Sequence, residues 1–298
     1  MVTSQSVVKM GESHFSSLIR AINSPLPTII DNVYDISMSF KIGVFDSGIG
    51  GFSILSKLIQ YYPEGEYFYI SDAPHAPYGP KEPQFIVERS RDIAQQLIDL
   101  DCDLIVVACN TATSLAIELL REEFKIPFIG VEPYLNSKHH LNLEGKKMVG
   151  LMTKATSSSE KFKKLKQKID PEEHITIHVC LQLASLVEMA FARECLTDDL
   201  VQEIHKELAP LKNGQFTHAI LGCTHYSLVD SVIRSYLNVE TLSPSEGVGK
   251  RLIQLLGLPK TEIKPLEHWR DVTFHFRLSN HSEWQQRPLS TTILSLAQ

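Results

Sequence analysis

The sequence of 298 residues contains no apolar run long enough to cross a bilayer. Its longest uninterrupted apolar stretches span about six residues, whereas a membrane-spanning helix needs about 20. The first residues also lack the charged start, apolar segment and small-residue cleavage site of a signal peptide. We therefore expect a cytoplasmic protein with no membrane partner.

Positive charge is not in excess either. The chain has 29 Lys and Arg residues against 35 Asp and Glu residues, which gives a formal net charge of −6. Binding to nucleic acid or to an anionic membrane surface draws on clustered positive charge. We therefore expect no direct nucleic-acid partner.

Cysteine is scarce. The five cysteines are an odd number in a chain that we expect to be cytoplasmic, which argues against a disulfide framework. There is no Cys-x-x-Cys pair or His/Cys cluster with the spacing of zinc ligands, so no metal is expected. The thiols are therefore predicted to be free. For Cys102 and Cys195 we expect the ordinary role of a small, buried, apolar side chain.

A complete dinucleotide-binding fingerprint is also missing. The stretch Asp46-Ser47-Gly48-Ile49-Gly50-Gly51 lies between a predicted strand and a predicted helix. However, Ser53 stands where the G-x-G-x-x-G motif requires its third glycine. Glycines beside a helix N-terminus still let a ligand approach free backbone N–H groups. The alternative to nucleotide binding is a site for a smaller charged group, with Asp46 pointing into the crevice.

What the sequence does contain is a repeated unit around two of its cysteines. The apolar run 104–108 ends at Cys109, two small polar residues follow, and a helical pattern begins at about Ser114. The run 219–222 ends at Cys223 in the same way, and a helical stretch follows over 226–236. Each unit is typical of a buried parallel strand with the cysteine at its carboxyl end. Because ligands bind at the carboxyl ends of such strands, we expect one thiol on each side of a crevice.

The remaining pattern is that of an α/β protein. Predicted strands cover 41–45, 66–71, 127–131, 148–152, 174–179 and, as a half-exposed edge strand, 272–278; predicted helices cover 52–62, 85–100, 184–191, 198–208 and 246–256. A further helix is predicted to end at Ile169, with Ser157 or Ser158 as its N-cap. The length suits two domains, and the composition turns polar between 132 and 145, so we place the first domain crossing there.

Residues 72–80 form a proline-rich loop after the second predicted strand. Prolines at positions 74, 77, 80 and 83 restrict the backbone and hold this loop in one shape. Such a loop is either a wall of a ligand site or a tight surface turn.

Two opposed thiols permit two kinds of chemistry, because a thiolate is both nucleophilic and basic. Cys223 with the nearby His225 would be a nucleophile of the hydrolase kind, but this leaves Cys109 without a role and requires the histidine to reach the sulfur. With both thiols, one removes a proton from a carbon and the other returns a proton to the opposite face. This inverts a stereocentre without a cofactor. Nearby Asn110, Thr111, Thr113 and Thr224 can donate hydrogen bonds to a substrate carboxylate.

Five short motifs occur between about residue 40 and about residue 285. They are Asp46-Ser47-Gly48-x-Gly50-Gly51, Pro77-Tyr78-Gly79, Ala108-Cys109-Asn110-Thr111-Ala112, Gly130-Val131-x-Pro133 and Gly222-Cys223-Thr224-His225-Tyr226. Each alone is unspecific. Together, in this order and spacing, they closely resemble the glutamate racemase family, the cofactor-independent branch of the aspartate/glutamate racemase superfamily.

The resemblance implies roles for individual residues. Cys109 and Cys223 match the two catalytic acid/bases, while Asp46 and His225 match auxiliary groups that tune or relay protons at the thiols. Glu188 matches a further acidic catalytic position of the family, near the Cys223 side. The implied substrate contacts are Ser47, Pro77, Tyr78, Gly79, Asn110, Thr111, Thr153 and Thr224. The implied substrate is glutamate, and the implied reaction needs no cofactor and no metal.

The resemblance also implies the fold class. It is α/β, with two flavodoxin-like three-layer α/β/α domains related by pseudo-twofold symmetry and the active site in the cleft between them. We expect a first domain of residues 40–134 plus 243–298 and a second of residues 135–242. The implied function is the interconversion of L-glutamate and D-glutamate, which supplies D-glutamate for peptidoglycan synthesis.

Residues 1–39 have no counterpart in most of the family. They are either an N-terminal extension or precede a natural start at Met38. In some members an extension is tied to activation by a cell-wall precursor, so the same role is one hypothesis here. A homodimer is a further expectation from the family. Two alternatives stay open: a relative that acts on aspartate or another acid, and a protein that binds DNA gyrase.

Overall fold

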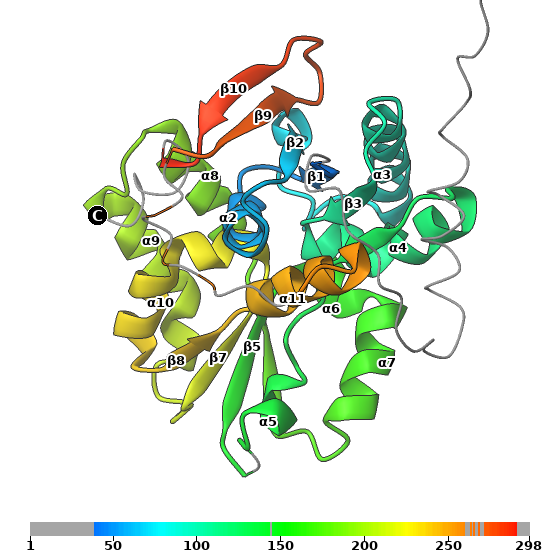
Figure 1. Cartoon of the computed structure of the whole chain (residues 1–298). Coiled ribbons are helices and arrows are strands. Elements are labelled where there is room, and N and C mark those ends of the chain that lie inside the picture. The colour runs from blue at the N-terminus through cyan, green and yellow to red at the C-terminus, as the bar shows by residue number, and fades with distance from the viewer. Residues whose placement is uncertain are drawn as a thin grey trace, which may run out of the picture. The chain divides into compact units, whose positions relative to one another are not determined.

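Two sheets organise the residues that the computed structural model describes, which are 39–143, 145–259, 263, 265, 268 and 271–290. Helices flank both sheets (Figure 1). The fold class is therefore α/β, as predicted. The question of an N-terminal extension or a start at Met38 lies outside the described residues, apart from Ser39.

The first sheet has six strands in the order β10-β9-β2-β1-β3-β4. Strand β1 pairs in parallel with β2 and β3, which places Asp46 beside Ser71 and Phe45 beside Val107. The strands are β1 (Lys41–Asp46), β2 (Glu66–Ser71), β3 (Leu104–Val107), β4 (Phe128–Gly130), β9 (Thr273–Leu278) and β10 (Gln285–Pro288). The accompanying helices are α2 (Phe52–Tyr61), the 3-10 turn η1 (Ala73–His75), α3 (Pro83–Ile98), α4 (Asn110–Glu123) and α11 (Ser245–Leu256).

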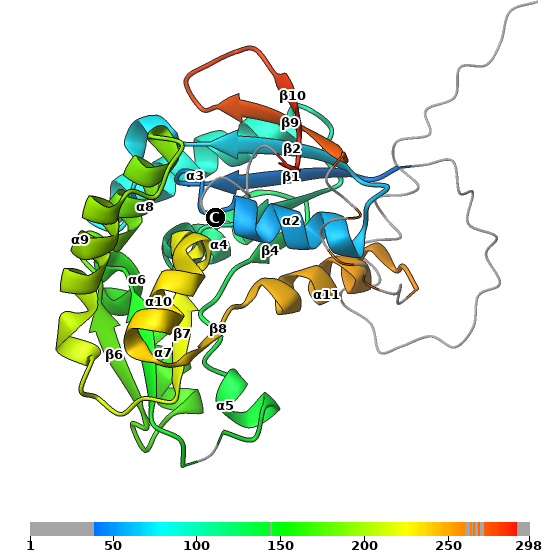
Figure 2. The ribbon, with the colours of Figure 1, turned by 90° about the vertical axis from the view of Figure 1, so that its left-hand side faces the viewer.

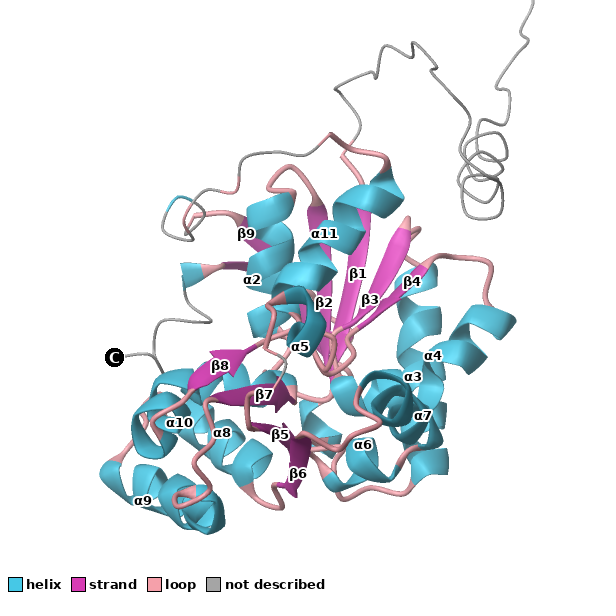
Figure 3. Cartoon of the chain, turned by 90° about the horizontal axis from the view of Figure 1, so that it is seen from below, coloured by secondary structure: helices cyan, strands magenta, loops and turns pink. Residues whose placement is uncertain are grey.

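The second sheet has four parallel strands in the order β6-β5-β7-β8 (Figure 3). They are β5 (Met148–Met152), β6 (Ile175–Val179), β7 (His218–Gly222) and β8 (Glu240–Leu242). The helical elements around it are α5 (Ser137–His140), α6 (Lys154–Ser158), α7 (Glu160–Ile169), α8 (Leu183–Ala192), α9 (Asp198–Leu208), η2 (Ala209–Leu211), η3 (Thr224–Val229) and α10 (Asp230–Leu237). Among the described residues, no helix combines the length and apolar character needed to cross a membrane.

Side chains of the first sheet alternate between two apolar layers, because successive residues of a strand face opposite sides. Val44 and Val106 pack in the cluster that contains Leu55 of α2 and residues of α11. Phe45 and Val107 pack in a second cluster with residues of α3 and α4. Helices α2 and α11 lie side by side on one face (Figures 1 and 2). Burial on both faces explains the unbroken apolar run of β3.

The second sheet is layered in the same way. Met152 and Ile220 pack with Phe162 of α7 on one face. Leu151 and Leu221 pack on the other face with residues of α8, α9 and α10, in the same cluster that lines α2 and α11. One continuous apolar cluster therefore connects the two sheets.

The two sheets repeat one topology. If the strands of each half are numbered along the chain, β1 to β4 and β5 to β8 both take the order 2-1-3-4, which is the flavodoxin-like arrangement. Cys109 follows β3 and Cys223 follows β7, the third strand of each repeat. Both cysteines thus occupy the sheet edge at which such folds bind ligands, as predicted.

Most predicted helix boundaries are met within two residues, and larger differences occur at three places. Helix α4 begins at Asn110 and not near Ser114, because the Cys109 sulfur accepts a hydrogen bond from the Ala112 N–H and caps the helix. The helix that ends at Ile169 is two helices, and Ser159, with an extended backbone, caps α7 in place of Ser157 or Ser158. The stretch after Cys223 begins with the 3-10 turn η3 before α10 starts at Asp230.

The half-exposed strand predicted over 272–278 is present as β9 (Thr273–Leu278), but the prediction that it lies at the edge of the sheet is wrong. Strand β9 pairs with β2 on one side and with β10 on the other. Polar and apolar residues alternate along β9 as they do in many edge strands. The polar residues are accommodated here on aromatic rings: His275 stacks on Phe68, and the Arg277 guanidinium lies over Trp284. Strand β10, with the sequence Gln-Gln-Arg-Pro, has no apolar pattern that would have identified it.

The division into domains at 134/135 and 242/243 stays a prediction. The C-terminal elements β9 and β10 pair within the first sheet, and α11 packs on α2. The chain therefore returns to the first sheet after β8.

The cap of α7 gives a test of the fold. The Ser159 hydroxyl accepts a hydrogen bond from the Phe162 N–H, 3.2 Å away. We expect Ser159→Ala to lower the free energy of unfolding by about 1 kcal/mol, because one backbone donor loses its partner. Ser158→Ala, at an exposed neighbouring position, is the matched control and should change it by less than about 0.5 kcal/mol. Equal effects of the two substitutions in urea unfolding would contradict the assignment of the cap.

Candidate active site

The site is built around the turn Asp46–Gly51, which links β1 to α2. The Gly48 N–H donates to Asp46 Oδ1 at 2.8 Å. The Gly48 carbonyl accepts from the hydroxyls of Tyr69 and Ser71, each at 2.9 Å. These buried hydrogen bonds hold the turn rigidly against the sheet.

Glycine is required in this turn because the other half of the fold comes very close. A Cβ atom on Gly48 would lie 1.7 Å from Glu188 Oε1, and one on Gly50 would lie 2.3 Å from His225 Nδ1. No side chain fits at such distances. The glycines therefore let the first sheet bring its turn into direct contact with α8 and η3.

Cys109 occupies the first side of the site. It is 5% exposed and caps α4, where its sulfur accepts the Ala112 N–H at 3.4 Å and contacts the Ser47 hydroxyl at 3.7 Å. Burial and the charge of Asp46 raise the pKa of the Cys109 thiol to about 12, although the hydrogen bond from Ala112 acts in the opposite direction. Cys109 therefore holds its proton tightly.

Cys223 occupies the second side and belongs to a chain of three groups. Its sulfur lies 3.7 Å from His225 Nδ1, and His225 Nε2 lies 2.6 Å from Glu188 Oε1. Glu188 Oε1 also accepts the Ile49 N–H at 3.0 Å. The histidine thus reaches the sulfur two residues away, because the 3-10 turn η3 folds the backbone back. His225 is therefore close enough to the sulfur for the Cys–His pair of the hydrolase alternative.

The electrostatics make His225 and Glu188 an ion pair. Burial would lower the pKa of His225, but Cys223 and Glu188 outweigh it and raise that pKa well above its ordinary value. Burial would raise the pKa of Glu188, but the hydrogen bond and charge of His225 hold it below its usual range. A proton therefore stays on the imidazole between sulfur and carboxylate.

Asp46 connects the two sides. Its Oδ1 atom is bound within the turn, while Oδ2 accepts the hydroxyl of Thr224 at 3.2 Å. Burial raises the pKa of Asp46, and the charge of His225 offsets only part of this effect. The Cys223 charge also raises the pKa of the Cys109 thiol. Asp46 and Cys223 therefore both act on the Cys109 thiol.

Hydroxyl groups line the site where α4 meets α6. Thr111 Oγ1 lies 3.0 Å from Thr153 Oγ1 and 3.3 Å from Thr156 Oγ1. Thr153 also caps α6 by accepting the Thr156 N–H at 3.2 Å. All three threonines are buried. Thr156 was not among the predicted substrate contacts, although its position three residues after Thr153 is a typical capping pattern.

Asn110 carries an unsatisfied acceptor. Its amide nitrogen donates to the Val131 carbonyl at 2.9 Å, whereas its amide oxygen is buried and has no hydrogen-bond partner among the described residues. An unpaired buried acceptor is costly unless a ligand uses it. Asn110 directly follows Cys109, so this oxygen can receive a donor from a bound molecule.

The proline-rich loop packs against the elements that carry Cys109 and Thr153, so it is not merely a surface turn. Tyr78 is buried, belongs to the same apolar cluster as Cys109 and donates its hydroxyl to Asp72 Oδ2 at 2.6 Å. The Gly79 carbonyl accepts the Ala155 N–H at 3.3 Å, and a Cβ on Gly79 would meet Thr153 at 3.2 Å. Pro77 is half-buried beside them.

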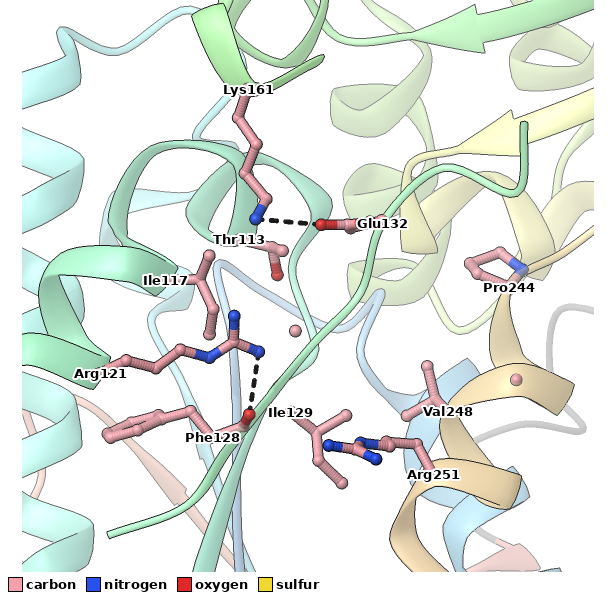
Figure 4. A pocket seen from close by; sticks show the side chains of 12 residues that line it. Thr113, Ile117, Arg121, Phe128, Ile129, Glu132, Lys161, Pro244, Val248 and Arg251 are labelled. Carbon is pink, nitrogen blue, oxygen red and sulfur yellow. Dashed lines mark hydrogen bonds and ion pairs between the residues drawn. The ribbon is translucent and has the colours of Figure 1, made fainter. Parts of the chain in front are cut away.

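A separate cavity of about 290 Å³ is lined by residues of α4, β4 and α11. Figure 4 shows its walls, which include Thr113, Arg121 and Arg251, and an ion pair of 3.0 Å between Lys161 and Glu132. Neither cysteine lines it. We place the candidate site at the thiols and not in this cavity, because the cavity contains neither of the two cysteines that follow the equivalent strands β3 and β7.

The predictions for Cys102 and Cys195 have different outcomes. Cys102 is buried as predicted, but Cys195 is exposed. The prediction for Cys195 is wrong because it follows α8 in a surface turn, just after Glu194 with φ of 53°. No group of three or more His, Cys, Asp or Glu side chains within the described ranges is arranged to hold a metal ion.

Comparison with known proteins gives a consistent result. The family model described as Asp/Glu/Hydantoin racemase matches residues 53–246. A Leptospira interrogans protein curated as glutamate racemase is 33% identical over 250 residues, which cover 80% of this chain and 95% of that protein. The Escherichia coli glutamate racemase, crystallised with L-glutamate and the activator UDP-MurNAc-Ala, has a TM-score of 0.69 at 26% identity and covers 87% of this chain and 94% of its own. The Francisella tularensis glutamate racemase, crystallised with D-glutamate, has a TM-score of 0.65 at 28% identity, with coverages of 82% and 89%.

The ion pair predicts a particular pH dependence of stability. The lowered pKa of Glu188 contributes stability above its ordinary value of 4.5, and the raised pKa of His225 contributes stability below its ordinary value of 6.5. We expect Glu188→Gln to lower the free energy of unfolding by about 2 kcal/mol between these two values. The difference should shrink as pH falls and Glu188 takes up a proton, and as pH rises through the raised pKa of His225.

Denaturant unfolding at several pH values measures this difference. Glu203→Gln is the matched control, because Glu203 forms an exposed pair with Lys206 and should contribute less than about 1 kcal/mol at any pH. A loss for Glu188→Gln that does not vary with pH would contradict the ion pair.

Proposed function

The chain belongs to the Asp/Glu/Hydantoin racemase family and is an isomerase, and we propose that it interconverts L-glutamate and D-glutamate by proton transfer at Cα. In this proposal Cys109 and Cys223 are the two acid/bases. Relatives of the same fold have been crystallised with L-glutamate and with D-glutamate. These complexes support glutamate as the substrate here.

One observation carries the proposal. The two cysteines end the third strand of the same repeated unit, and both meet the single turn Asp46–Gly51: Cys109 through Ser47, and Cys223 through His225 and Gly50. A molecule held at that turn would have one sulfur on each side. A hydrolase based on Cys223 and His225 alone would leave the matching position of Cys109 unexplained.

In the proposed reaction, one thiolate removes the proton from Cα. The electron pair of the broken C–H bond is delocalised into the substrate carboxylate, where hydrogen-bond donors stabilise the charge. The other thiol donates its proton to the opposite face of Cα, which gives the mirror-image amino acid. The two sulfurs have then exchanged protonation states, so the opposite enantiomer runs the same steps in reverse.

The surroundings of the two sulfurs fit complementary roles. The protonated imidazole of His225, held by Glu188, lies 3.7 Å from the Cys223 sulfur and can donate a hydrogen bond to it. The raised pKa of the Cys109 thiol keeps its proton available for donation. We therefore assign Cys223 as the base and Cys109 as the acid of the resting enzyme, with Asp46 as an auxiliary group between them.

The polar groups of the site match the polar groups of an amino acid. The unpaired Asn110 amide oxygen can accept a hydrogen bond from the substrate ammonium group. The hydroxyls of Ser47, Thr111, Thr153 and Thr224 and the N–H groups at the start of α4 can donate to its carboxylates. Tyr78 and Gly79 close one wall, and Pro77 supports them.

The biological context follows from the same proposal. D-glutamate made by this reaction would supply peptidoglycan synthesis in the cytoplasm. Activation by a cell-wall precursor through residues 1–39 remains our hypothesis, prompted by the activator bound to the E. coli relative. A homodimer remains an expectation drawn from the family.

Single substitutions of the two cysteines test the proposal. We expect Cys109→Ser and Cys223→Ser each to reduce racemisation of either enantiomer of glutamate by roughly 10²–10⁴-fold, because a serine hydroxyl is a much weaker base and acid at neutral pH. Polarimetry with purified protein measures the rate. Cys102→Ser is the matched control and should retain activity, because Cys102 is buried but precedes β3, at the end of the strand opposite to Cys109. Full activity in either Cys109→Ser or Cys223→Ser would refute the two-base reaction.

A further inference from the structure

Asp72 is a buried carboxylate for which the proposed reaction has no use. It follows β2 and is 0% exposed. Its backbone N–H donates to the Asp46 carbonyl at 3.0 Å, so it stands next to the catalytic turn. A carboxylate that is fully desolvated must be compensated by charge and hydrogen bonds.

The compensation comes from several separate segments of the chain. Arg89 of α3 binds it with two nitrogens, Nη2 to Oδ1 at 2.8 Å and Nε to Oδ2 at 3.1 Å. His75 Nδ1 lies 3.0 Å from Oδ1, and Ser279, just after β9, donates its hydroxyl to the same oxygen. Tyr78 donates to Oδ2 at 2.6 Å. Hydrogen bonds led by those of Arg89 hold the pKa of Asp72 below its usual range against the effect of burial.

One of these partners leads into the candidate site. The Tyr78 hydroxyl is the donor to Asp72, and burial together with the Asp72 charge raises the pKa of Tyr78, so the phenol keeps its proton. The following residue, Gly79, contacts Thr153 and accepts the Ala155 N–H at 3.3 Å. Thr153 in turn lies 3.0 Å from Thr111. A continuous set of contacts thus runs from Asp72 to the hydroxyls that line the site.

We propose that Asp72 and Arg89 are positioning residues that hold the Tyr78–Gly79 wall against Thr153 and so set the affinity of the site for its substrate. This proposal rests on the glutamate racemisation proposed above. Neither residue would touch the substrate. Their effect would pass through the Tyr78 hydroxyl and the loop that carries it.

Stability alone is a weak explanation for this arrangement. A buried ion pair contributes little net stability compared with apolar residues of similar size, because both charges must be desolvated. What the pair adds is a fixed geometry, since the planar guanidinium binds a carboxylate through two parallel hydrogen bonds. That geometry fixes the position of Asp72 Oδ2, which accepts the hydrogen bond from the Tyr78 hydroxyl.

The proposal predicts a split between KM and kcat. Arg89→Met should raise KM for glutamate about tenfold or more and change kcat much less, because the wall contributes to binding and not to proton transfer. Arg89→Lys keeps the charge but loses the second hydrogen bond, so its KM should lie between those of wild type and Arg89→Met. A purely structural role would lower the amount of active enzyme and hence kcat, with KM unchanged.

A double-mutant cycle with Tyr78→Phe tests the route. If Arg89 acts through Asp72 on the Tyr78 hydroxyl, the KM increase of the double variant should be clearly smaller than the product of the two single increases. Independent effects would multiply. Multiplicative KM values would therefore overturn the proposal even if each single variant binds glutamate weakly.

Controls separate the possible failures. Arg91→Met lies on the same helix and breaks an exposed pair with Glu123, so its KM should match wild type. Should Arg89→Met fail to fold, Ser279→Ala removes one donor from Asp72 with no unpaired buried charge and should raise KM in the same direction. An active wild type whose KM is unchanged by Arg89→Met, Arg89→Lys and Ser279→Ala would overturn the positioning role alone. A wild type that does not racemise glutamate would instead overturn the proposed function.

Discussion

The close approach of the turn Asp46–Gly51 to α8 and η3 is the constraint on which the site depends. Glu188 and His225 lie so close to Gly48 and Gly50 that neither glycine position has room for a side chain. Buried hydrogen bonds from Tyr69 and Ser71 keep the turn in place. Through this contact, the edge of the first sheet meets the edge of the second at one small region. The flavodoxin-like topology brings a cysteine to each edge, and the turn brings the two edges together.

The repeated topology places the two thiols equivalently, but their surroundings are unequal. Cys109 is buried next to the Asp46 carboxylate, which raises the pKa of its thiol to about 12. Cys223 lies beside an imidazole whose proton is held by Glu188. The backbone thus supplies symmetry, whereas a few charged side chains supply the difference between a proton donor and a proton acceptor. Inversion at one carbon atom requires a proton acceptor on one face and a proton donor on the other.

The sequence predicts the features that follow from local pattern. Unbroken apolar runs that end at Cys109 and Cys223 identify buried strands and the sheet edge, and both lie where expected. Features that depend on contacts between separate parts of the fold cannot be predicted from local sequence pattern. Glu188 carries no local signal on its helix and is reached only through the family resemblance, and the contact of His225 with its sulfur depends on the 3-10 turn η3. Strand β10 has the sequence Gln-Gln-Arg-Pro, which lacks an apolar pattern, and is recognised only by its pairing with β9 in space. Helix α4 begins at Asn110 because the Cys109 sulfur caps it. The sequence pattern places this start too late, because cysteine is not an expected capping residue.

Exchange of the Cα proton measures the central claim, a two-base inversion, most directly. Wild-type protein would be incubated with L-glutamate in D₂O without added cofactor, and the Cα proton signal and the optical activity would be followed together. The account predicts that both decay, that the D-glutamate formed carries deuterium at Cα from the first turnovers, and that L-aspartate is unchanged. Loss of the Cα proton with full retention of optical activity would mean that one thiol works from one face only, and it would contradict the account.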